Sequence, residues 1–253
     1  DVAAPLRRRK IALGAFEPFG KEFLQCGKAV CSNTRDALTV LRRSEGRHAE
    51  KEKKDYAGAY QYLLRCHLPC LQTSSAYMNA ASYLHVLAGL HQIQARHRMQ
   101  KNDAKGALAQ ARKAAFYSIH NADFYIDIIR DLDAAGSRQD ADQLIAEVGK
   151  GWLQILKTFP DSAMAHNNFA WLYSRCRRNL EQALKHARAA VKLEPKTAAY
   201  LDTLAEVHFQ LGDRDKAVAF EQQAAALQPG RKFFQDRIQE FKTKPLPKKR
   251  MDK

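Results

Sequence analysis

The stretch AAYLDTLAEVHFQLGDRDKAVAFEQQAAALQP, residues 198–229, decides the fold. It divides at the turn sequence LGDRD into two segments rich in helix-forming residues, and it closes at Pro229. Two helices joined by so short a turn run antiparallel. Ala217 and Pro229 each have a counterpart 34 residues earlier, at Ala183 and Pro195. A fixed spacing of this kind predicts repeated units that stack on one another.

The repeat continues toward the N-terminus with one longer unit. Ala141 lies 34 residues after Ala107 but 42 residues before Ala183, so we expect that unit to be longer by eight residues, in its second helix. The pattern predicts about four repeats over residues 55–229. Whether a degenerate fifth repeat precedes them is left open by the sequence, in which three residues have the right spacing: Ala57, Leu64 and Pro69.

A 34-residue helix–turn–helix period with small residues at fixed places resembles the tetratricopeptide repeat (TPR) family. With Ala198 as position 1, the last unit carries the family pattern at Leu201, Leu204, Ala205, Gly212, Ala217, Ala224 and Pro229. The unit before it carries Ala170, Trp171, Ala183, Ala190 and Pro195. The resemblance implies an all-α, right-handed superhelix of stacked antiparallel helix pairs.

One position departs from the family pattern. Position 24, where a bulky residue is usual, holds Ala111, Ala187 and Glu221. We expect Phe220, beside Glu221, to take that place after a small rotation of the helix.

The segments outside the array differ from it in pattern. Residues 1–54 read as a basic N-terminal segment with short helices, and a helical run of about 30 residues begins at Thr73 or Ser74. Residues 230–242 are predicted to form a C-terminal capping helix, and residues 243–253 a disordered basic tail. The capping helix has a regular apolar stripe: Phe233, Phe234, Ile238 and Phe241.

The positive charge gathers at the two ends of the chain. The net charge is +15, of which residues 1–54 carry +6, residues 230–253 carry +6 and residues 55–229 only +3. A groove for a nucleic-acid backbone needs its basic residues on the folded body, so nucleic-acid binding is disfavoured. The basic ends leave an alternative open, in which the protein docks on an acidic polymer, a filament or an anionic surface. A second alternative is an assembly or regulatory domain cut from a longer protein.

The sequence contains no pattern typical of catalysis. HExxH, Walker A, GxGxxG and GxSxG motifs are absent, so we expect no catalytic residues, no cofactor and no enzymatic activity. The nine histidines are interpreted as surface or packing residues.

Four cysteines form two pairs along the chain. Their spacings, four and three intervening residues, differ from those of common zinc knuckles, so we expect no metal site. They are interpreted as reduced helix residues, with disulfides as the alternative in an oxidising compartment. The four are Cys26, Cys31, Cys66 and Cys70.

The sequence favours a cytoplasmic protein without a transmembrane segment, because no apolar run approaches the length of about 18 residues that spans a bilayer. The N-terminus lacks Met and is compatible with processing, so a periplasmic or secreted location stays open.

The TPR resemblance also implies where a partner binds. In the family the concave face is lined by first-helix positions 2, 5, 9, 12 and 13, and this face holds a peptide or helix of another protein. Asp202 and Glu206, one helical turn apart, are expected to form an exposed acidic spot, and Asn168 and Arg130 to bond a peptide backbone or carboxylate. The expected groove residues are Arg130, Asn168, Leu172, Arg175, Asp202, Glu206 and Phe209. The expected function is therefore that of a non-enzymatic interaction scaffold or adaptor.

Overall fold

The computed structural model describes residues 80–247. Every regular element in this range is an α-helix, as the sequence predicts. The helices are α4 (Ala80–Gln100), α5 (Ala104–Tyr117), α6 (Ala122–Ala134), α7 (Arg138–Thr158), α8 (Ala163–Arg175), α9 (Leu180–Leu193), α10 (Ala198–Gln210), α11 (Arg214–Leu227) and α12 (Lys232–Thr243).

Some of the sequence-based expectations fall outside the described residues. They concern the segment 1–54, the degenerate fifth repeat, the helix start at Thr73 or Ser74, the end of the basic tail at 248–253, and the cysteines Cys26, Cys31, Cys66 and Cys70.

The chain divides into two compact units, residues 1–97 and 98–253. From the first unit the structure describes α4 as far as His97, in which Ala88 and Ile93 are buried. The second unit holds α5 to α12.

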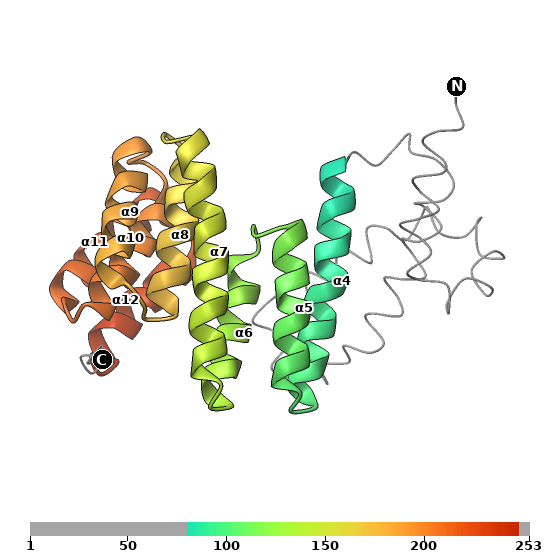
Figure 1. The fold of residues 1–253 in the computed structure, drawn as a ribbon. Helices are drawn as coiled ribbons and strands as arrows, with labels where there is room; N and C mark the ends of the chain where they lie inside the picture. The colour runs from blue at the N-terminus through green and yellow to red at the C-terminus, as the bar shows by residue number, and fades with distance from the viewer. Residues whose placement is uncertain (1–79, 248–253) are drawn as a thin grey trace, which may run out of the picture. The chain divides into compact units, whose positions relative to one another are not determined.

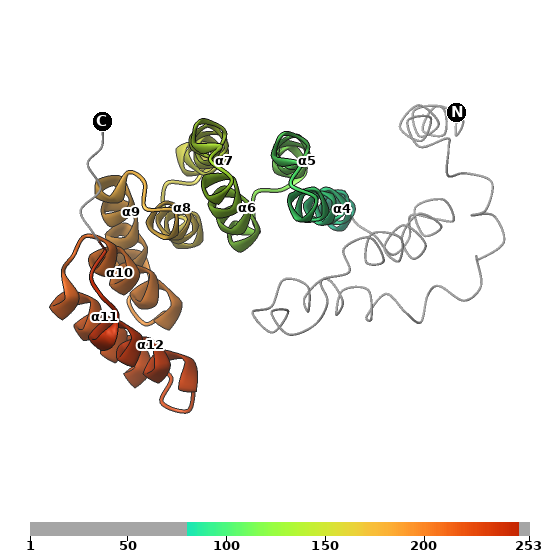
Figure 2. The same cartoon turned by 90° about the horizontal axis from the view of Figure 1, so that it is seen from below.

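The second unit is built from helix pairs stacked in chain order. The pairs are α6 with α7, α8 with α9, and α10 with α11, and α12 packs on α11 at the end (Figure 1). Helix α10 also packs on α8, and α8 on α6, so the first helices of successive pairs lie beside one another. The view in Figure 2 shows the same succession from below. The fold is an all-α, TPR-like solenoid, which confirms the predicted class.

The turns inside the pairs share one backbone geometry. Gly136 and Gly212 have φ of 77° and 89°, Arg177 adopts positive φ at the matching place between α8 and α9, and Asn102 does so in the turn between α4 and α5. Each is followed by a backbone N–H that returns to a carbonyl five residues earlier, as from Asp213 to the carbonyl of His208 at 2.9 Å. This is the Schellman closure of a helix end, which favours glycine and tolerates asparagine. Its recurrence shows that the units repeat in local structure as well as in sequence.

Helix α7 is the longer second helix that the 42-residue spacing predicts. It has 21 residues, whereas α5, α9 and α11 have 14 each. The added length buries Trp152 completely. Within the part of α7 that matches the shorter second helices, Gly149 lies against the Tyr173 side chain of α8, with no room for a Cβ. A side chain at that position would therefore displace the end of the Tyr173 side chain.

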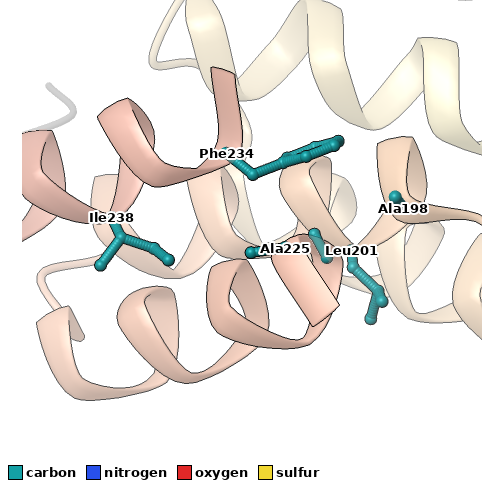
Figure 3. Close-up of a cluster of buried hydrophobic side chains, with 6 residues drawn as sticks. Ala198, Leu201, Ala225, Phe234 and Ile238 are labelled. Carbon is teal, nitrogen blue, oxygen red and sulfur yellow. The ribbon is translucent and has the colours of Figure 1, made fainter. Parts of the chain in front are cut away.

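Helix α12 covers the end of the last pair with an apolar stripe. Phe234 and Ile238 pack on Ala198, Leu201 and Ala225 (Figure 3). Further along the helix, Phe241 packs on Phe209. The remaining expected member of the stripe, Phe233, is only partly buried.

Phe220, which the sequence predicts to replace a bulky residue at position 24, is partly buried beside that position. It packs against all three apolar clusters of the last two pairs, which is the role of a large side chain at that place. Glu221, at position 24 itself, is completely buried.

Candidate functional site

A cleft of about 280 Å³ opens across the first helices α6, α8 and α10. The lining residues of these three helices fall between positions 1 and 8 of their units, and the two residues that precede α6 complete the lining. The lining residues are His120, Asn121, Ala122, Asp123, Asn167, Asn168, Trp171, Ala199, Asp202 and Thr203. The cleft therefore lies on the face that the TPR resemblance assigns to a partner.

Trp171 organises the centre of this cleft. Its indole Nε1 donates a hydrogen bond of 2.9 Å to Oδ1 of Asp123, which joins α8 to the first turn of α6. On the same helix, the guanidinium of Arg175 lies 5.1 Å from the centre of the Trp171 ring, within the range of a cation–π contact. Sequence reasoning used Trp171 only to count repeats. Its signal is its size, because Trp171 stands at position 8, where the last unit has the small residue Ala205.

Two neighbouring asparagines of α8 contribute unused polar groups. Asn168, an expected groove residue, is partly exposed at the cleft, and in residues 80–247 its amide has no hydrogen-bond partner. Asn167 also lines the cleft, and its Oδ1 is enclosed without a donor. Enclosed polar groups normally have hydrogen-bond partners. The Asn168 amide and Asn167 Oδ1 are therefore available for hydrogen bonds with a ligand.

The expected exposure of Asp202 and Glu206 is wrong. Asp202 is 8% exposed and Glu206 1% exposed, because Arg237 of α12 lies against both. Arg237 donates from Nε to Asp202 Oδ1 at 3.1 Å and from Nη2 to Glu206 Oε2 at 2.6 Å. Helix α12 packs on α11, and its Arg237 reaches across to cover Asp202 and Glu206 of α10. Asp202 still contributes to the lining of the cleft, whereas Glu206 does not.

Glu206 belongs to a buried ionic network between three helices. Arg175 of α8 donates to its Oε1 at 3.1 Å, and Gln210 donates to the same oxygen at 2.8 Å. Burial alone would raise the pKa of Glu206, but the charges of Arg175 and Arg237 prevail and lower this pKa to about 2. Glu206 is therefore ionised at neutral pH and ties α8, α10 and α12 together.

Glu221 of α11 lies at the edge of this network without a cation of its own. Both of its carboxyl oxygens are enclosed, and neither has a hydrogen-bond partner of good geometry within residues 80–247. Burial, and after it the negative charge of Asp202, raises the pKa of Glu221 to about 9. Glu221 is therefore protonated at neutral pH.

The other expected groove residues divide between surface and core. Arg130 is exposed and donates from Nη2 to the backbone carbonyl of Arg175 at 3.0 Å. Leu172 and Phe209 are buried and cannot contact a ligand, and Phe209 packs on Ala217 of α11 and Phe241 of α12. Of the seven expected residues, Asn168 and Asp202 meet at the cleft.

The described part of the chain offers no metal site. Between residues 80 and 247 there is no group of three or more His, Cys, Asp or Glu side chains placed to hold an ion. Cys176 is buried, and burial raises the pKa of its thiol to about 12, so it is not a thiolate at neutral pH. None of the helices α4 to α12 is long and apolar enough to span a membrane.

Comparisons with known proteins bear on the fold. No protein-family model matches the sequence, and no curated protein matches it. Among solved structures, the MamA protein is similar at 13% identity and a TM-score of 0.34, over 77% of this chain and 93% of the other. YrrB, described as a TPR protein with an unusual peptide-binding site, is similar at 16% identity and a TM-score of 0.37, over 84% and 96%. TM-scores and identities this low do not indicate what this chain binds. The fold assignment rests on the helix pairs described above.

Proposed function

We propose that this chain is a non-enzymatic interaction scaffold, which holds an extended peptide segment of a partner protein in the cleft across α6, α8 and α10. The observation that carries the proposal is the unpartnered amide of Asn168 at that cleft. A side-chain amide both donates and accepts, so it matches the alternating N–H and C=O groups of an extended backbone.

The size and lining of the cleft support a peptide over a small cofactor. Its volume of about 280 Å³ is at the lower limit of the range of roughly 300–1,000 Å³ that is usual for small-molecule pockets. The small side chains of Ala122 and Ala199 lie among polar residues, which leaves room for a main chain to approach α6 and α10. We also propose that the scaffold acts in the cytoplasm, as the sequence leads us to expect.

Asn168→Arg tests the proposal, because the longer side chain fills the cleft without breaking any hydrogen bond of the native fold. Wild-type and variant protein are used as baits in a native extract, and the bound proteins are quantified by mass spectrometry. The matched control is Gln222→Arg, an exposed position on the second helix α11. We expect at least one partner to be lost with Asn168→Arg and kept with Gln222→Arg. Equal recovery of every partner by both variants would refute a role for the cleft.

A further inference from the structure

We infer that the cleft selects a cationic side chain, lysine or arginine, from the peptide segment that it holds. This inference rests on the proposed function and names the chemistry of the ligand. It is carried by the side chains around Asp123 and Trp171.

The lining of the cleft contrasts with the composition of the chain. Residues 55–229, which supply the whole lining, contain 20 Lys and Arg residues, yet none of the ten lining residues is Lys or Arg, and two of them are aspartates. Asp123 supplies a carboxylate, and Asn167 supplies an enclosed carbonyl oxygen that lacks a donor. Lysine and arginine carry donors and no acceptors, so they complement this set, whereas a glutamate would add one more acceptor.

Two arginines that contact lining residues of the cleft, Arg175 and Arg237, are already engaged. Arg237 is paired with Asp202 and Glu206, and Arg175 is paired with Glu206 at 3.1 Å. Asp123, in contrast, forms no ion pair with any residue in the described range, and its partner there is the neutral indole of Trp171. Its negative charge is therefore available to a ligand.

The protein uses the same recognition chemistry within its own fold. The guanidinium of Arg237 meets the carboxylate of Asp202 at 3.1 Å and lies 4.3 Å from the ring centre of Phe241. At the cleft, the hydrogen bond from Trp171 fixes the Asp123 carboxylate beside an indole ring. A cation entering there meets the Asp123 carboxylate beside the Trp171 ring, which already has the guanidinium of Arg175 at 5.1 Å from its centre. The carboxylate is therefore the group that attracts the entering cation, as Asp202 attracts Arg237 within the fold.

The two tryptophans of the chain allow a direct test on the full-length protein. Trp152 is completely buried, whereas Trp171 lies at the cleft, so the two indole ¹⁵N–¹H signals separate the core from the site. The probes are acetylated and amidated pentapeptides, Gly-Gly-Arg-Gly-Gly and Gly-Gly-Glu-Gly-Gly, at equal ionic strength. We expect the arginine peptide to shift the Trp171 signal saturably and to leave the Trp152 signal in place. The glutamate peptide should bind at least tenfold more weakly.

Asp123→Asn keeps an acceptor for the Trp171 hydrogen bond and removes the charge. We expect it to weaken binding of the arginine peptide at least about fivefold. The matched control is Asp215→Asn, which removes an exposed carboxylate from the first turn of α11 and should leave binding unchanged.

The outcomes separate this inference from the proposed function. If the glutamate peptide shifts Trp171 as strongly as the arginine peptide does, the cleft binds peptides but does not select a cation. Unchanged binding of the arginine peptide by Asp123→Asn also overturns the selection. If neither peptide shifts the Trp171 signal, both the inference and the peptide-binding cleft are wrong.

Discussion

Replacing Arg237 with methionine tests whether the buried ionic network holds the end of the array together. The guanidinium is enclosed and bonds Asp202, Glu206 and Glu240 at 2.6 to 3.1 Å. Methionine keeps much of the side-chain volume but leaves two buried carboxylates without their shared cation. Breaking one buried ion pair costs about 3–5 kcal/mol. Glu206 keeps Arg175, so we expect the lower end of that range, about 3 kcal/mol.

The loss should appear mainly in the last pair and α12. In a solenoid each unit contacts only its neighbours, so α6 and α7 should be little affected. For a domain of this size, 1 kcal/mol corresponds to a shift of about 2–4 °C in the melting temperature, which predicts a decrease of about 6–12 °C. Calorimetry gives the shift, and amide hydrogen exchange shows whether the lost protection lies in α10 to α12.

The pH dependence of this variant has a definite sign. The pKa of Glu206 is lowered to about 2 in the folded protein, so its ionised form stabilises the fold above the unfolded pKa and loses this effect as the pH falls toward 2. Without Arg237 that contribution shrinks, so the difference from wild type should be larger at pH 7 than at pH 3. The control is Lys232→Met, an exposed change on the same helix that should stay within about 0.5 kcal/mol of wild type. Equal melting of Arg237→Met and Lys232→Met at pH 7 would refute the reasoning.

Two further predictions concern buried titratable groups. The pKa of Glu221 is raised to about 9, so folding takes up a proton there and stability falls as the pH rises from about 5 to 9. Glu221→Gln should remove this pH dependence and raise the free energy of unfolding by about 1–3 kcal/mol at pH 8 but only slightly at pH 5. Urea unfolding at the two pH values measures the difference, and an equal gain at both would contradict the raised pKa. Burial, and then the neighbouring charges of His166 and Lys185, lower the pKa of His186 to about 4, so stability should fall by up to about 3 kcal/mol as the pH drops from 6.5 toward 4. NMR titration of the His186 ring and melting curves of His186→Phe test this, and a ring that titrates near 6.5 would exclude it.

The fold could be predicted because its determinants are local and repeated. Gly212 closes a turn that only a few residue types adopt readily, and Ala183 and Ala217 allow close helix contact. Both kinds of position recur at fixed spacing. The longer α7 was predictable for the same reason, because the inserted residues increase the spacing between the repeated alanines Ala141 and Ala183 from 34 to 42.

The site could be predicted only in part, because it depends on contacts between residues distant in sequence. A residue of the concave face is open to a ligand only if no side chain of another helix covers it. Asn168 is partly exposed at the cleft, whereas Arg237 of α12 covers Asp202 and Glu206. The stripe of α12 showed that a helix would pack there, but Arg237 is a single charged residue within it. Nothing in its sequence position indicates that it reaches across to α10.

The network around Arg237 also bears on how this array can be engineered. A repeat fused in place of α12 would receive two buried carboxylates, Asp202 and Glu206, on the surface where it has to stack. A consensus repeat with an apolar or acidic residue opposite them would leave this charge uncompensated. Grafted units must therefore bring a guanidinium to the place of Arg237, or the acceptor surface must first be neutralised by Asp202→Asn and Glu206→Gln. Interfaces between units of this array are thus not interchangeable, and its last junction accepts only a helix of matching charge.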